Sequence, residues 1–344
     1  MDGTHIKKID FETHFILPEF LTYLNNRTEY PYCKENAEKH QHLTFHSDKV
    51  TVTHNDALVN HLLSLADARL QLMDETGIDI QILSHTVPSF GVIENADVAT
   101  SLARDANDLL ADAIKKNPTR FRGFAAIAPQ DTKSAVKELE RCITELGFVG
   151  WLTHSNYGEN KYLDDKQYWP LLELAESLNI PIYLHPTIPG IKQYQDYGYA
   201  LAGPGFGFHA EASLLFMRMI LAGVFEEFPK LQVMMGHLGE GIPFFMERLD
   251  FAFDKAWARE ALKRSFQRKP TEILRQNTYV TVSGRFYEAA LKYTIEAMGS
   301  DRILFATDHP YESMQHAVDY VAKASISEED RKKIFCDNAQ KFVK

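Results

Sequence analysis

The chain has 344 residues, of which 45% are hydrophobic and 24% are charged, and this balance is typical of a globular protein with a large buried core. It excludes a disordered or fibrous chain. Lys and Arg number 37 against 47 Asp and Glu, which gives a formal net charge of −10. No basic run is long enough to follow a phosphate backbone, so nucleic acid is not an expected partner.

The cysteines and the apolar runs indicate the compartment. Cys33, Cys142 and Cys336 lie far apart and are odd in number, so we expect free thiols and neither a disulfide framework nor a zinc knuckle. The N-terminal segment lacks the apolar stretch of a signal peptide, and no run approaches the roughly 18 apolar residues of a membrane span. We therefore expect a cytoplasmic protein without a membrane partner.

Short apolar runs rich in β-branched and aromatic residues predict eight strands. These runs span residues 6–11, 78–84, 121–128, 148–153, 181–185, 231–237, 279–283 and 302–307. Segments with helical periodicity precede several of them, at residues 97–116, 134–146, 168–177 and 289–298. Strands and helices that alternate in this way are typical of an α/β protein, and we predict a (β/α)8 TIM barrel.

Three connections are longer than a plain barrel requires, namely residues 15–65, 186–212 and 238–277. Each follows a predicted strand, so we expect insertions at the C-terminal face, where they distort the barrel and form walls over a pocket. No linker rich in Pro or Ser divides the chain, and no internal repeat is detectable. We therefore predict a single domain over residues 1–344.

Polar residues with metal-binding side chains fall at the predicted strand ends. Glu12 and His14 follow the first strand, His185 ends the fifth, His237 ends the sixth and Asp308 follows the eighth. Glu12 and His14 are two positions apart and point to the same side of an extended segment. Two imidazoles and two carboxylates gathered at this face suit one zinc, manganese or iron ion. Each residue taken alone could instead belong to a buried polar network, be solvated or cap a helix.

A second cluster begins at His237, with Glu240 three residues later and Arg248 eleven residues later. A turn or a helix start would bring the imidazole and the carboxylate together as a proton relay. Arg248 can bind a substrate carboxylate through two parallel hydrogen bonds. The alternatives are a structural Gly-rich turn and, for Arg248, a surface ion pair with Glu247 or Asp250.

Other histidines carry a weaker signal because they show no ligand spacing. We expect a solvated or structural role for the histidines in the first insertion: His40, His42, His46, His54 and His61. Tyr311 adjoins the predicted face and can stack on an aromatic ring or simply belong to the core.

These motifs resemble the amidohydrolase superfamily, in particular its amidohydrolase-2 branch of metal-dependent decarboxylases that act on hydroxylated benzoates. The resemblance covers nearly the whole chain. The motifs that carry it are Glu12-Thr13-His14, Tyr183-Leu184-His185-Pro186, Gly236-His237-Leu238-Gly239-Glu240 with Arg248, and Thr307-Asp308-His309-Pro310-Tyr311-Glu312.

The resemblance implies one divalent ion, zinc or manganese with magnesium possible, held by Glu12, His14, His185 and Asp308. It also implies that His237, Glu240 and Arg248 serve substrate binding and proton transfer. Many hydrolases of the superfamily begin with His-x-His, whereas this chain has Glu-x-His, as in γ-resorcylate (2,6-dihydroxybenzoate) decarboxylases.

The expected function is a reversible, non-oxidative decarboxylation of a hydroxylated aromatic carboxylate in aromatic compound catabolism, with Asp308 as the candidate acid. The resemblance also implies a homodimer or homotetramer. Two alternatives remain: a metal-dependent hydrolase of a lactone or amide, and a metal-stabilised binding or structural protein.

Overall fold

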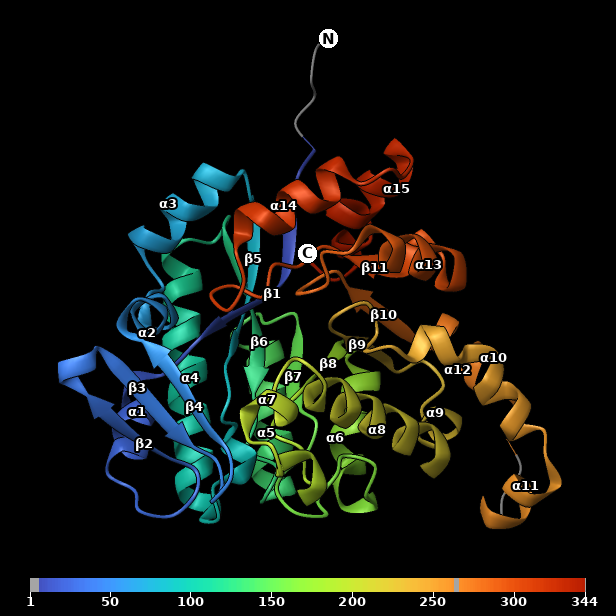
Figure 1. Cartoon of the computed structure of the whole chain (residues 1–344), viewed down its shortest axis with the longest axis horizontal. Coiled ribbons are helices and arrows are strands. Elements are labelled where there is room, and N and C mark those ends of the chain that lie inside the picture. The colour runs from blue at the N-terminus through green and yellow to red at the C-terminus, as the bar shows by residue number, and fades with distance from the viewer. Residues whose placement is uncertain (1–5, 263–265, 344) are drawn as a thin grey trace, which may run out of the picture.

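The computed structural model describes residues 6–262 and 266–343, and its central feature is a parallel sheet that curls into a barrel (Figure 1). Within the described residues this sheet has eight strands in the order β1, β5, β6, β7, β8, β9, β10, β11. Their bounds are β1 Ile9–Phe15, β5 Ile80–His85, β6 Phe121–Ala126, β7 Gly150–His154, β8 Pro181–His185, β9 Gln232–Met235, β10 Thr278–Thr281 and β11 Ile303–Leu304. The order matches the predicted strands and confirms the (β/α)8 barrel.

Helices pack around the strands and also build the insertions. Their bounds are α1 Pro18–Asn25, α2 Asp56–Leu63, α3 Asp67–Thr76, α4 Ala96–Lys116, α5 Thr132–Thr144, α6 Trp169–Ser177, α7 Tyr199–Ala202, α8 Gly207–Ala222, α9 Val224–Glu227, α10 Ile242–Phe253, α11 Ala256–Leu262, α12 Pro270–Asn277, α13 Glu288–Met298, α14 Met314–Lys323 and α15 Glu328–Lys332. The four predicted helices correspond to α4, α5, α6 and α13. Side-chain caps fix several starts: Asn95 accepts the N–H of Val98 at 3.1 Å ahead of α4.

The first strand lies later in the sequence than predicted. It spans Ile9–Phe15 and not residues 6–11, so Glu12 and His14 lie inside the strand and not after it. All seven of its residues are buried, polar ones included. The hydrophobic run ends at Phe11, and the sequence pattern could not reveal that the polar residues beyond it continue the strand.

The barrel closes between the last strand and the first, and this seam is irregular. β11 has only two residues, and the segment that follows it continues the pairing with β1. The N–H of Phe11 donates to the carbonyl of Phe305 at 3.0 Å, and the N–H of Asp308 donates to that of Glu12 at 2.9 Å. The barrel is therefore distorted at this point, and its closure brings Asp308 to the first strand.

The end of the barrel formed by the N-terminal ends of the strands is filled by aromatic side chains. Phe11 packs edge-on against Phe124 at 6.0 Å and against Phe342 at 5.9 Å between ring centroids, and Phe342 also contacts Tyr279 at 5.0 Å. These contacts seal the N-terminal ends of the strands with a residue from the end of the chain. The opposite, C-terminal face is left to the polar residues of the site.

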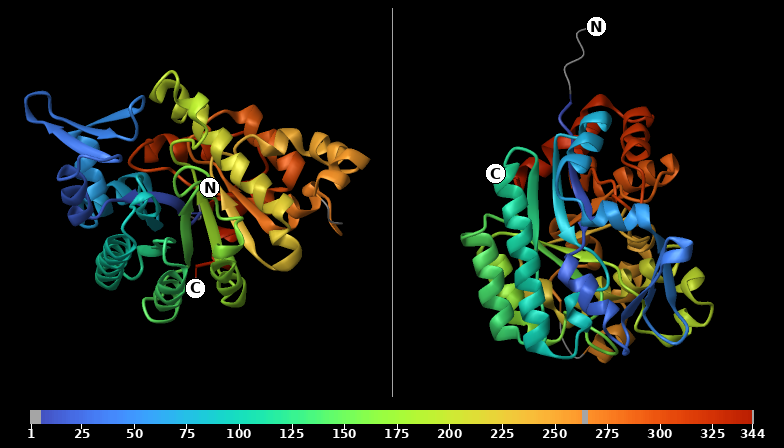
Figure 2. Two further views of the ribbon diagram at one scale, coloured as in Figure 1. Left: turned by 90° about the horizontal axis from the view of Figure 1, so that it is seen from below. Right: turned by 90° about the vertical axis from the view of Figure 1, so that its left-hand side faces the viewer.

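The insertions contribute structure on two sides of the barrel. The first contains a small antiparallel sheet of β2 Tyr32–Asn36, β3 Gln41–Phe45 and β4 Thr51–Asn55. The second includes α7, and the third includes α10 to α12, with residues 263–265 outside the described part. Figures 1 and 2 show β2 to β4 (blue) on the opposite side of the molecule from α10 and α11 (orange). The interpretation as one domain remains a prediction.

Cys33, Cys142 and Cys336 are buried and free, as predicted. In the described part of the chain, no helix has both the length and the apolar character needed to cross a bilayer.

Candidate active site

Four side chains with metal-binding atoms meet at the C-terminal face of the barrel. Glu12 and His14 come from β1, His185 ends β8, and Asp308 follows β11. One ligand atom from each lies within 4.8 Å of the others. The structure therefore brings together the four residues that the sequence predicts as one metal group.

Hydrogen bonds orient both histidines toward the centre of this group. The Nδ1 of His14 lies 3.1 Å from the hydroxyl of Ser84, and its Nε2 lies 3.1 Å from Oδ1 of Asp308. The Nδ1–H of His185 donates to the carbonyl of Pro186 at 2.7 Å. Because the Nδ1 of His185 is engaged, its Nε2 is left with its lone pair toward the group, the arrangement that outer hydrogen bonds give to histidine ligands, and the Nε2 of His14 faces the carboxylate of Asp308. Burial lowers the pKa of His185 to about 3 and keeps its ring neutral.

Glu12 has an oxygen that the described residues leave unpaired. Its Oε2 accepts hydrogen bonds from Ser283 and Thr281, whereas its buried Oε1 has no hydrogen-bond partner among the described residues. Burial and the charge of Asp308 raise the pKa of Glu12. A divalent cation would supply both the missing partner and the compensating charge. The residues present therefore fit one metal ion.

His237 and Glu240 are joined by an unusual turn after β9. Five consecutive residues adopt left-handed backbone angles: φ is 54° at His237, 57° at Leu238, 79° at Gly239, 54° at Glu240 and 84° at Gly241, the N-cap of α10. Such angles cost free energy in residues other than glycine, and they are concentrated at functional sites. The turn places Nδ1 of His237 2.9 Å from Oε1 of Glu240, which confirms the predicted pairing.

The other nitrogen of His237 faces the metal group. Its Nε2 lies 3.7 Å from Oδ2 of Asp308. Burial alone would lower the pKa of His237, but the carboxylate of Glu240 raises it well above the usual value. Burial would raise the pKa of Asp308, but the hydrogen bond from His14 and the nearby imidazole of His237 outweigh it and hold that pKa low. The imidazole of His237 is therefore protonated beside an ionised Asp308.

Two residues that the sequence did not reveal extend this chain of contacts. His209, on α8, binds Oε2 of Glu240 through its Nδ1, and Arg285, after β10, binds the Nε2 of His209. Arg can only donate, so Nε2 of His209 accepts and its proton sits on Nδ1. Burial would raise the pKa of Glu240, but the charge of His237 and the N–H of His209 lower it to about 2. In sequence, His209 is one histidine near a helix start, which carries no signal.

Arg248 is not brought to this group. It is exposed on α10, and its guanidinium lies 5.0 Å from the centroid of the Phe251 ring. It is absent from the cavity wall described below. Its predicted contact with a substrate carboxylate remains a prediction.

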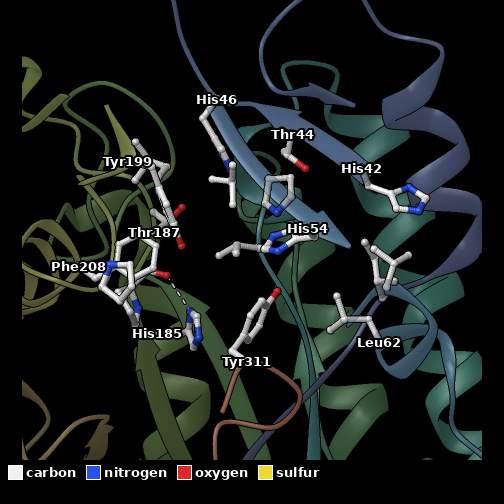
Figure 3. Close-up of a pocket in the computed structure, with 18 of the residues that line it drawn as sticks. His42, Thr44, His46, His54, Leu62, His185, Thr187, Tyr199, Phe208 and Tyr311 are labelled. Carbon is white, nitrogen blue, oxygen red and sulfur yellow. Dashed lines mark hydrogen bonds between the residues drawn. The ribbon is translucent and has the colours of Figure 1, made fainter. Parts of the chain in front are cut away.

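A cavity of about 270 Å³ opens above the metal group, a size suited to a small ligand. His185, His237, Asp308 and Tyr311 form its floor on the barrel side, as the close-up in Figure 3 shows for His185 and Tyr311. The small sheet and α2 form the other side, where half of the lining side chains are apolar: Cys33, Val52, Val59 and Leu62. The same wall carries His42, His46 and His54. Sequence reasoning assigned these histidines no place in the cavity.

A comparison of the sequence with models of protein families agrees with the fold and these motifs. The amidohydrolase profile matches residues 9–344. The chain belongs to the amidohydrolase family. This result confirms the resemblance seen in the sequence motifs.

Within the family, the chain is similar to decarboxylases of dihydroxybenzoates. It is 42% identical to γ-resorcylate decarboxylase of Polaromonas sp. strain JS666 over 83% of this chain and 90% of that protein. It is 36% identical to γ-resorcylate decarboxylase of Rhizobium sp. strain MTP-10005 over 98% of each chain. The crystal structure of a dihydroxybenzoic acid decarboxylase from Polaromonas, with manganese and the inhibitor 2-nitroresorcinol, superimposes with a TM-score of 0.83 at 37% identity, covering 98% of this chain and 96% of that one.

Proposed function

We propose that this protein is a metal-dependent, non-oxidative decarboxylase, a carboxy-lyase that acts reversibly on a hydroxylated aromatic carboxylate of the dihydroxybenzoate type. The observation that carries the proposal is the Glu12, His14, His185 and Asp308 group at the floor of a cavity, with His237 facing Asp308 at 3.7 Å. Its support is the similarity to γ-resorcylate decarboxylases along nearly the whole chain.

Glu12, His14, His185 and Asp308 would hold one divalent ion, manganese or zinc, with magnesium possible. Such an ion would supply Lewis-acid chemistry that binds the anionic substrate and orients its ring. Manganese is the first ion to test, because the related Polaromonas structure contains it.

The side chains of this protein would move the proton. Decarboxylation requires a proton on the ring carbon that bears the carboxylate; the bond to that carboxylate then breaks, its electrons return to the ring, and carbon dioxide leaves. Asp308 is the proposed acid at that carbon. Since the pKa of Asp308 is low, it needs a proton from His237, whose pKa is raised and whose Nδ1 is held by Glu240.

A homodimer or homotetramer is part of the proposal. Exposed aromatic side chains on α10 and α11 and at or near the start of α13 support it, because exposed apolar groups that gather in patches commonly mark protein contacts. These residues are Phe244, Phe245, Phe251, Trp257, Tyr287 and Tyr293, with Phe244 72% and Trp257 63% exposed. Light scattering coupled to size-exclusion chromatography gives the state directly. The cytoplasmic location stays a prediction.

The reaction is tested by incubating the metal-loaded protein with a panel of hydroxybenzoates, including 2,6- and 2,4-dihydroxybenzoate, in deuterium oxide. The expected product is the corresponding phenol with one deuterium at the carbon that carried the carboxylate. At high bicarbonate the same site should slowly carboxylate that phenol ortho to a hydroxyl, since both directions share the same groups.

A lactone and amide panel is assayed in parallel. Cleavage of one of these compounds, with no carbon dioxide from any hydroxybenzoate, would replace the decarboxylase by a hydrolase in which Asp308 is the general base.

A further inference from the structure

The inner face of the small sheet forms the side of the cavity opposite the metal group. His42 and Thr44 on β3, and His46 just after it, alternate along the strand, as do Val52 and His54 on β4. Alternate residues of a strand point to the same face. All five line the cavity, so this face of the sheet forms one wall of the cavity and contributes three imidazoles to it.

Two of these imidazoles have no hydrogen-bond partner in the described protein. His42 is bound to Asp56 at 3.1 Å, and Thr44 lies 3.2 Å from the sulfur of Cys33. Neither ring of His46 or His54 makes a side-chain hydrogen bond to a residue in the described ranges. Both side chains are only partly buried and line the cavity, so a ligand that fills the cavity would displace water from these rings. The ring nitrogens of His46 and His54 are available to a ligand.

The spacing between the metal group and this wall suits one aromatic ring. Tyr311 lies between them: its ring centroid is 5.7 Å from that of His14 and 5.8 Å from that of His54. Figure 3 shows His54 above Tyr311, with His46 farther up the same wall and His185 across the cavity. A ring anchored at the metal group and lying beside Tyr311 would bring its far edge to His54, with His46 farther along the same wall.

The protonation state of His46 and His54 determines which chemical group they can bind. Burial, reinforced by His54, lowers the pKa of His46 to about 4, and burial also lowers the pKa of His54. A neutral imidazole has one donor and one acceptor, which match a hydroxyl group. Among the described residues only the Glu12 group has metal-ligand spacing, so a second metal ion does not account for the pair.

We propose that His46 and His54 form a subsite for a hydroxyl group on the ring edge farthest from the metal. This inference rests on the proposed function and narrows its substrate class to 2-hydroxybenzoates with a further hydroxyl at position 4 or 5. The compound 2,6-dihydroxybenzoate lacks that hydroxyl and leaves both imidazoles unpaired. The chain therefore differs in substrate preference from the γ-resorcylate decarboxylases that it resembles.

The test measures binding without turnover. In unreactive probes a nitro group replaces the carboxylate: 2-nitrophenol has no distal hydroxyl, 2-nitroresorcinol has a second ortho hydroxyl, and 4-nitroresorcinol and nitrohydroquinone each have a distal hydroxyl. Calorimetry on the manganese-loaded protein should show that the tighter-binding of the two distal probes binds about tenfold or more tightly than 2-nitrophenol, as expected for gaining one or two hydrogen bonds. 2-Nitroresorcinol should not show this gain.

Variants assign the gain to the two histidines. His46→Phe and His54→Phe keep a planar ring but remove its nitrogens, and each should reduce the affinity ratio by about threefold to tenfold. His54→Gln, which can donate and accept, should restore part of the ratio. Thr53→Val is the matched control: Thr53 is the exposed neighbour on the other face of β4, and the ratio should not change.

An equal affinity of the wild type for all four probes would overturn the subsite, and so would a ratio that survives both Phe substitutions. Unchanged metal content in each variant shows that the cavity has folded. If the distal probes are preferred but no hydroxybenzoate releases carbon dioxide, the subsite stands and the decarboxylase proposal fails. If carbon dioxide is released without any preference for a distal hydroxyl, the decarboxylase proposal stands and the subsite fails.

Discussion

The backbone N–H of Asp308 donates to the carbonyl oxygen of Glu12 at 2.9 Å, and this bond belongs both to the seam of the barrel and to the metal group. The seam is irregular because β11 contributes only two residues to regular pairing. Closing the barrel and assembling two of the four proposed ligands are therefore the same structural event. A metal ion held by these side chains would stabilise the pairing between β1 and the segment that follows β11.

Metal binding should consequently stabilise the fold. Elemental analysis is expected to give one divalent ion per chain, and added manganese should raise the melting temperature, since an ion that binds only the folded state stabilises it by mass action. His185→Ala should lose most of the metal and the thermal response. His54→Phe alters a histidine of the same cavity outside the ligand group, so it should keep both. Wild-type protein with neither bound metal nor a thermal response would contradict the metal site.

Asp308→Asn should separate metal binding from catalysis. The amide can still offer an oxygen to the ion, but it cannot deliver a proton, so turnover should fall by about 100-fold or more while part of the metal is retained. The measurement is the rate of carbon dioxide release at matched metal content. Near-normal turnover in the metal-loaded variant would transfer the role of acid to His237.

His209 should act on the reaction through Glu240. His209→Leu removes the N–H that holds Oε2 of Glu240, so His237 loses part of its support and kcat should fall about tenfold, with KM nearly unchanged. His209→Gln offers an amide N–H and should recover part of kcat. His40→Asn is a suitable control because the His40 side chain is exposed and its Nδ1 bonds to Asp56, away from Glu240. An equal fall in both His209 variants would indicate a packing role instead.

Arg248 tests the prediction that the structure leaves open. If it binds the substrate carboxylate, Arg248→Ala raises KM for the hydroxybenzoate and changes kcat little. Arg248→Lys keeps the charge but loses the paired hydrogen bonds, so its KM should lie between those of the wild type and the Ala variant. Steady-state kinetics with parallel light scattering checks both variants. An unchanged KM at an unchanged oligomeric state would show that Arg248 does not bind the substrate carboxylate.

The barrel and the metal group were predictable because they depend on local patterns. Buried strands read as apolar runs, and the C-terminal ends of parallel strands meet at one face, so Glu12, His185 and Asp308 could be grouped without a structure. The start of β1 was placed too early because its polar residues face the site and not the solvent. Polar residues that face the site therefore interrupt the apolar pattern by which a buried strand is recognised in sequence.

The rest of the site depends on contacts between distant segments. His46 and His54 look like surface histidines until the small sheet folds over the barrel and turns one of its faces inward. His209 and Arg285 meet only when α8 packs beside the loop that follows β10. No spacing in the sequence encodes these contacts, because the insertions that make them have no repeating pattern.

Arg69 provides a test of how the site is supported from outside. It is buried on α3, and its guanidinium donates to the carbonyl oxygens of His14 at 2.7 Å, Ser64 at 2.8 Å and His61 at 3.1 Å. Burial lowers its pKa to about 10, so it remains charged at neutral pH. The side chain thus ties the end of the strand that carries two proposed ligands to the first insertion.

Arg69→Met keeps much of the volume but leaves these buried carbonyls without a donor, so the free energy of unfolding in urea should fall by about 3–5 kcal/mol. Arg69→Lys should be nearly as destabilised, because one ammonium group cannot reach three separated carbonyls. Arg104→Met is the matched control: the Arg104 side chain is 58% exposed and lies 4.0 Å from Glu138, so the loss should stay within about 1 kcal/mol. Metal affinity should also fall in Arg69→Met, since the end of β1 loses its anchor. A stability equal to that of Arg104→Met would show that these carbonyls find other partners and that the strand end needs no such tie.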